Sequence, residues 1–129
     1  SFVVYNSVNS EEVFRIWGNG SVNAKGIYAQ QFKVKAQFGD YYWPDYVFND
    51  DYVLMELSQL KSFINENQHL PNVPSKDEVA MEGVDLGEMT TVLLQKIEEL
   101  TLYIIKQDEQ IKELKNEMNI LKEDQNIQK

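Results

Sequence analysis

The residues in this sequence best suited to chemistry are the aromatic and acidic side chains of residues 38–54, FGDYYWPDYVFNDDYVL. Aromatic rings offer flat faces on which a sugar can stack, and clustered carboxylates can bind calcium. The spacing of the aspartates is not that of an EF-hand loop, which requires D-x-[DN]-x-[DN]-G. The alternative, which we favour, is that the rings pack as a lid on a core. If the segment binds a ligand, the patch comprises Tyr41, Tyr42, Trp43 and Tyr46.

Catalytic chemistry has less support. His69 is the only histidine, and although a Ser/His/Asp triad needs only one, nothing places a nucleophile beside it. We expect it to cap a helix end or contact the core. Asp50 and Asp51 could serve glycoside hydrolysis, which needs two carboxyl groups at a set separation, but adjacent loop acids are usually solvated. Motifs for phosphate, dinucleotide or zinc binding are missing from the sequence. We therefore predict no enzymatic activity, no metal and no cofactor.

The composition of the chain argues against nucleic acids and membranes as binding partners. The 129 residues carry a net charge of -9 and include no cysteine. A chain without a basic patch cannot replace the counterions of phosphates, so we expect neither nucleic acid nor a membrane surface as partner. The sequence also lacks an apolar run of about 18 residues, so no membrane span is expected. Because the chain starts SFVVYN without Met, we expect a C-terminal fragment of a longer protein.

The element that dominates the sequence is residues 86–129. With Ile97 at heptad position a, apolar side chains recur at a 3,4 spacing over roughly five heptads, which is typical of a coiled coil. A single helix cannot bury such a stripe, so we predict self-association; the alternative is a helix folded back on its own domain. The predicted oligomer interface comprises Leu86, Leu93, Ile97, Leu100, Ile104, Gln107, Ile111, Leu114, Met118 and Leu121.

The outer positions of this helix divide it in two. They are also apolar in its first half, as at Leu94 and Tyr103, but polar or charged in most of its second half. A helix that is apolar all round is buried. We therefore expect the rest of the chain to cover residues 86–105, and the remainder to protrude as a stalk. Glu117 at g and Lys122 at the following e favour parallel helices, and Ile at a with Leu at d favours a dimer.

The upstream sequence predicts short strands and short helices. Strands are expected at residues 2–5, 13–17, 21–24, 26–29 and 32–35, with a tight turn at Gly18-Asn19-Gly20. They are too short and sparse to close a barrel within one chain, so we predict that they intertwine with strands of other copies around a shared axis.

Residues 39–85 are predicted to form an aromatic loop and short helices. Pro44 should prevent a regular helix in the loop. A helix follows at residues 55–68, and a capping box of Ser75 with Glu78 begins another that ends at Gly83. The predicted fold class is thus α+β, in three parts: a β-rich shaft end (1–38), the loop and short helices (39–85), and a parallel coiled-coil helix (86–129). A second capping box, Asp85 to Glu88, begins that last helix.

Several strings together resemble a C-terminal module of tail-fibre-like proteins of bacteria and phage: WPDYVF, NQHLPNVPS, GVDLGEM and LLQKIEELTLYII. The resemblance spans about Trp43 to Ile105, and FRIWGNGSVNAKGIYAQQFKVK is similar to the β repeat that precedes such modules. In related fibres, C-terminal domains of the endosialidase type act as intramolecular chaperones that nucleate trimerisation and set the register of a β-rich shaft. Some of them then cleave themselves at a serine.

The resemblance implies a parallel homotrimer, with a dimer as the second choice. It also implies a location on a virion tail fibre or a bacterial cell surface. The Ser-Asp and Arg-Leu-Lys elements of the self-cleaving group are not found here, so no catalytic residue is carried over. We predict a structural assembly module. The alternatives are an adhesin tip that binds surface glycan through residues 41–52, and a hydrolase or self-cleaving protease.

Overall fold

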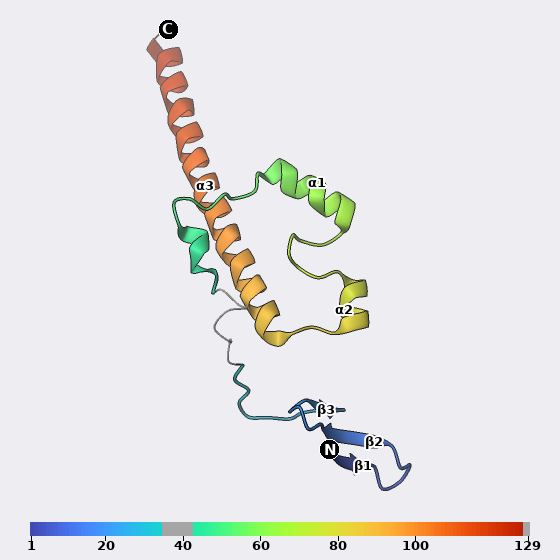
Figure 1. The fold of residues 1–129 in the computed structure, drawn as a ribbon. Helices are drawn as coiled ribbons and strands as arrows, with labels where there is room; N and C mark the ends of the chain where they lie inside the picture. Colours follow the sequence, from blue (N-terminus) through green and yellow to red (C-terminus); the bar gives the residue numbers. More distant parts are fainter. Residues whose placement is uncertain (35–42, 128–129) are drawn as a thin grey trace. The chain divides into compact units, whose positions relative to one another are not determined.

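The computed structural model describes residues 1–34 and 43–127, and the chain divides into two compact units, Ser1–Lys33 and Val34–Lys129 (Figure 1). The first unit contains the strands and the second contains the helices, so the fold is α+β, as predicted. Tyr41 and Tyr42 of the predicted ligand patch lie outside the described residues. In the described part of the chain, no helix combines the length and the apolar character that crossing a membrane requires.

The first unit is an antiparallel sheet of three strands, β1 (Phe2–Tyr5), β2 (Glu12–Ile16) and β3 (Val22–Ala24), in that order. Phe2 pairs with Ile16, and Phe14 pairs with Ala24. The turn between β2 and β3 contains Gly20 at φ 88°, a conformation that glycine adopts without steric cost. Three of the predicted strands are therefore confirmed, each within about a residue.

The strand predicted at residues 26–29 is wrong, and residues 32–34 form none either; Lys35 lies outside the described residues. Ile27 and Tyr28 are exposed instead. Their β-branched and aromatic side chains fit a strand, but a strand also needs a neighbour that supplies backbone hydrogen bonds. β3, the nearest sheet edge, is only three residues long.

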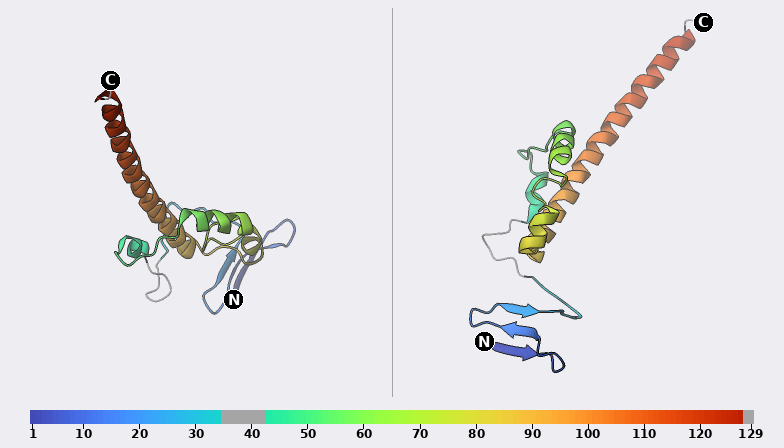
Figure 2. Two further views of the ribbon diagram at one scale, coloured as in Figure 1. Left: turned by 90° about the horizontal axis from the view of Figure 1, so that it is seen from above. Right: turned by 90° about the vertical axis from the view of Figure 1, so that its right-hand side faces the viewer.

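The second unit consists of a long helix, α3 (Leu86–Ile127), and three short ones: η1 (Pro44–Phe48), α1 (Leu57–Asn67) and α2 (Lys76–Glu82). Only η1 among them packs its backbone closely against α3. Figure 1 and the two views of Figure 2 show α1 and α2 as parts of a loop that leaves α3 and returns to its first turn. Residues 56–85, which form this loop, are called the arm below.

The caps of these helices follow the sequence closely. Ser75 Oγ accepts a hydrogen bond from the Glu78 amide (3.3 Å), and Glu78 Oε2 accepts one from the Ser75 amide (2.7 Å), which confirms the capping box. Gly83 ends α2 at φ 78°. At the start of α3, Asp85 Oδ1 accepts from the Glu88 amide (2.9 Å), so the predicted N-cap is present.

The expectation that Pro44 would prevent a regular helix is corrected in one respect. Residues 44–48 form a single 3₁₀ turn with Pro44 in its first position. Proline is tolerated there because the first amide of a helix has no partner within the helix, and because its fixed φ already suits the turn.

Candidate assembly surface

The predicted interface lies on one uncovered stripe of α3, called the seam below. Its nine apolar side chains keep between 49% and 61% of their surface exposed, and Gln107 is exposed as well. The described part of the chain therefore does not cover the seam, although its members are among the most apolar residues present. They are Leu86, Leu93, Ile97, Leu100, Ile104, Ile111, Leu114, Met118 and Leu121.

The opposite side of the first half of α3 is covered by η1. Val47 is 1% exposed and Pro44 is also fully buried, which makes them the most buried side chains of the described residues. The chain then continues along α3, where Tyr52 Oη donates to Glu99 Oε1 (2.6 Å) and Tyr103 Oη donates to the Met55 carbonyl. This segment, residues 44–55, is called the jacket below.

A polar network within α3 surrounds Glu99, the acceptor of the bond from the jacket. Gln95 Nε2 donates to Glu99 Oε1 (2.8 Å), and Lys96 Nζ pairs with Glu99 Oε2 (2.9 Å). Burial, followed by the hydrogen bond to Glu99, raises the pKa of Tyr52 to about 12. The phenol therefore keeps its proton at neutral pH and remains a donor.

Glu98 is a buried carboxylate, 8% exposed, and its Oε2 has no hydrogen-bond partner in the described structure. Burial raises its pKa, and the negative charge of Asp45 on η1 raises it further. Burying an unpaired charge is unfavourable, so this position opposes attachment of the jacket whenever Glu98 is ionised. Sequence reasoning missed Glu98; the available signal was an acid inside a stretch predicted to be covered.

Two residues of the predicted ligand patch are described: Tyr46 lies on the jacket, and Trp43 directly precedes it. Trp43 is 58% exposed and Tyr46 is 38% exposed. The Tyr46 ring packs at a tilt against that of Tyr52, with centroids 5.9 Å apart. Tyr46 thus shares in the packing that holds the jacket in place, while Trp43 presents most of one indole to its surroundings.

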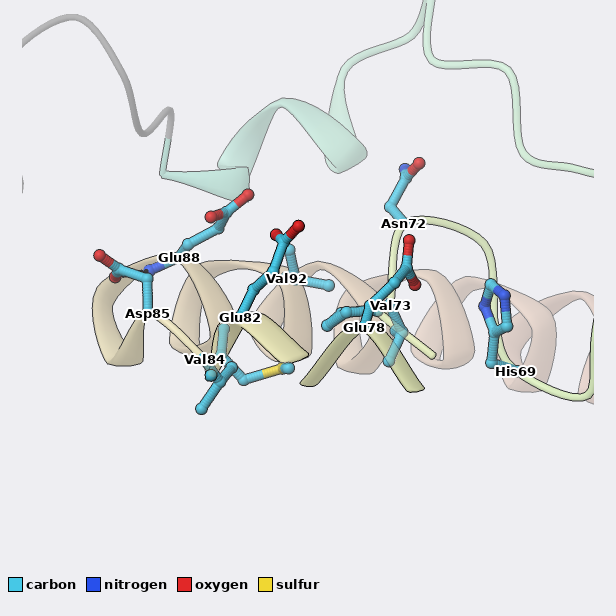
Figure 3. Close-up of a pocket in the computed structure, with 12 residues that line it drawn as sticks. His69, Asn72, Val73, Glu78, Glu82, Val84, Asp85, Glu88 and Val92 are labelled. Carbon is cyan, nitrogen blue, oxygen red and sulfur yellow. Dashed lines mark hydrogen bonds between the residues drawn. The ribbon is translucent and has the colours of Figure 1, made fainter. Parts of the chain in front are cut away.

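The arm and the first turns of α3 enclose a pocket of about 520 Å³ (Figure 3). Val73, Val84, Met89 and Val92 provide an apolar lining, and a row of carboxylates lies along it. Figure 3 shows His69 at one end of this row and Asp85 at the other. The acids are Glu78, Glu82, Asp85 and Glu88.

His69 has a structural setting in this pocket. Its ring meets that of Phe63 edge to face, with centroids 5.7 Å apart, and Nδ1 lies 3.0 Å from the Leu70 carbonyl. It follows Gln68, which ends α1 at φ 61°. Within residues 1–34 and 43–127, His, Asp and Glu side chains form no cluster of three that could hold a metal ion.

Comparison with protein-family models, with curated proteins and with solved structures finds no match for this chain. The function therefore has to be argued from the seam, the jacket and the arm.

Proposed function

We propose that this chain is an assembly module that joins identical copies through the seam of α3, as a parallel homotrimer. The observation that carries the proposal is the exposure of all nine apolar seam residues in the single chain. Each one buried by a neighbouring copy contributes roughly 1.5–3 kcal/mol before the entropy of association is subtracted. A seam of this length therefore favours the assembled state strongly.

The helices should run in the same direction. A parallel arrangement places Glu117 at position g beside Lys122 at position e of the next copy, with opposite charges. The number three rests on the likeness to the endosialidase-type chaperone domains, since Ile at a with Leu at d would by itself favour two chains. The same likeness is the basis for a location on a tail fibre or cell surface.

Assembly through α3 would serve the strands upstream. Pairing of strands between copies is non-local and slow, and unpaired strand edges aggregate. Holding the copies together at one end gives that pairing an aligned start. The exposed Ile27 and Tyr28, which pair with no strand among the described residues, are candidates for pairing between copies.

Sedimentation equilibrium tests the proposal directly. We expect a mass about three times the 15.1 kDa of one chain. A mass about twice that of one chain would show a dimer in place of a trimer and would still agree with assembly through the seam. A monomer at micromolar concentration would refute the proposal.

A second function is supported by the exposed Trp43, which could stack on a sugar of a surface glycan. A glycan array should then lose its signal with Trp43→Ala and keep it with Trp17→Ala, an equivalent change in the first unit. An array on which both variants behave like the original chain would count against an adhesin.

A further inference from the structure

The arm carries an apolar face that its own chain leaves uncovered. Leu57 and Ile64 lie seven residues apart on α1, hence on one side of the helix, and both are exposed. No residue of α1 or α2 is buried, and neither helix packs its backbone against any other element of the described chain. An isolated helix of 11 residues is marginal in water, so its stability calls for a packing partner.

The two ends of the arm are fixed on its own α3. One end is held where Tyr103 Oη donates to the Met55 carbonyl, and the other where Asp85 caps the first turn of α3. The arm is thus attached at the two ends of a stretch of α3, from Leu86 to Tyr103, over which the helix rises by about 25 Å. Within it lie the seam residues Leu93, Ile97 and Leu100.

The heptad positions identify the side of α3 from which the arm emerges. Tyr103, where it starts, occupies position g, and the α3 residues that line the pocket near its end occupy g (Met89) and the adjoining positions c and f (Asp85, Glu88 and Val92). In a parallel bundle, position g of one helix lies next to position e of the neighbouring helix. The arm is therefore on the side that faces the next copy.

That side of the next copy offers a matching surface. Its e and b positions within reach of the arm include Leu94 and Ile105, which are apolar although they lie outside the seam. Ile105 is half exposed in the single chain. Isoleucine gains no stability from burial at an outer position that faces water, whereas it does at a position covered by another helix.

We propose that each arm docks on a neighbouring copy of the chain, with α1 lying along the e side of that copy's α3, next to the b position of Glu98 that its own jacket covers. This inference rests on the proposed function, because it requires parallel α3 helices in register. It adds a second interface to the seam and makes each copy hold the next. Two copies could then separate only if the contacts of the arm were also broken, which slows dissociation.

Disulfide trapping tests this directly, because the chain contains no cysteine of its own. Chains with Ile64→Cys and size-tagged chains with Thr101→Cys are mixed unfolded, refolded together and oxidised. Both side chains are exposed, and Thr101 occupies position e within reach of the arm. We expect a mixed disulfide between the two kinds of chain. Leu57→Cys provides a second arm position.

The control is Lys115→Cys, which also occupies position e but lies two heptads further along α3 than Thr101. The yield of its mixed disulfide with Ile64→Cys should be lower by at least about tenfold, because this thiol is not held at a high effective concentration near the arm. In a second experiment, one chain carrying both Ile64→Cys and Thr101→Cys is diluted with cysteine-free chains. A link between copies is lost on dilution, and a link within one copy is not.

Sedimentation of the same samples separates the two possible failures. Monomers would refute the seam and the docked arm together. Assembled chains that form only links within one copy, or no link from either arm position, would overturn arm docking and leave the proposed function intact.

Discussion

Tyr52 Oη donates a hydrogen bond to Glu99 Oε1 over 2.6 Å, and so joins two residues that are 47 positions apart in the sequence. The bond ties the end of the jacket to the outer side of α3, on the face away from the seam. Covering that face leaves the seam as the one long apolar stripe of α3 that the described chain does not cover.

Replacing Tyr52 by Phe should therefore loosen the jacket at a cost of about 1 kcal/mol, because a bond to a charged, partly exposed acceptor is lost. The folded pKa of about 12 exceeds the ordinary value of 10, so this contribution is constant below pH 10 and is lost as pH rises towards 12. Hydrogen exchange of residues 44–55 measures the effect. Tyr28→Phe, at a fully exposed position, should change nothing.

Charges in the seam should have unequal effects along α3. Leu100→Asp and Ile104→Asp each should abolish assembly, whereas Ile111→Asp should weaken it less because the second half of the helix has no jacket to position it. Ile120→Asp is the matched control: its exposure, 58%, is close to the 56% of Leu100, but it lies at position c, outside the seam. Sedimentation should show an intact assembly for this control, and equal losses at Leu100, Ile104 and Ile111 would contradict the division of the helix.

Gln107 places one amide of each copy in the seam. Gln107→Leu should raise the melting temperature, since each copy would gain roughly 1.5–3 kcal/mol from the buried leucine. The polar layer also limits register, so the variant should populate additional registers or numbers of copies. Native mass spectrometry and thermal melts measure both effects, with Gln110→Leu at position g as the control. An unchanged melting temperature would place Gln107 outside the interface.

Glu98→Gln should stabilise the jacket at neutral pH. Burial and the charge of Asp45 raise the folded pKa of Glu98, so folding favours the protonated carboxyl group. The stability that this protonated form gives to the folded chain is complete below the ordinary pKa of 4.5 and is lost as pH rises through the folded pKa. The difference in unfolding free energy between variant and original should therefore grow from about pH 4 to pH 7. Denaturant titrations at several pH values measure it. Glu113→Gln, on the uncovered part of α3, should show no such trend.

Ser75→Ala should destabilise α2 by about 1 kcal/mol, since the Glu78 amide loses its acceptor. The hydrogen bonds from Ser75 lower the pKa of Glu78, so the stabilisation by its carboxylate is present above the ordinary value of 4.5 and is lost as pH falls through the lowered one. Faster hydrogen exchange in residues 76–82 should report the change. Ser58→Ala on α1 is the control, and equal exchange in both variants would argue against the capping box.

The sequence predicted well those features that depend on neighbours along the chain. The Ser75 and Asp85 caps, the end of α2 at Gly83 and the start of α3 at Leu86 follow from which side chain or φ value a helix terminus accepts. The seam is equally local, because a helix of fixed pitch places residues three and four apart on one side. The candidate assembly surface could thus be identified before any coordinates.

The tertiary structure decided what lies against what. It placed Val47 and Pro44 of the aromatic segment on the first half of α3, and it buried the carboxylate of Glu98 beneath them. It also left residues 26–29 outside the sheet despite their β-forming side chains, and it left α1 and α2 without close backbone packing against α3. These outcomes depend on contacts between residues far apart in the sequence. A local pattern describes only one of the two surfaces in such a contact, whereas the free energy of burial and of strand pairing depends on both.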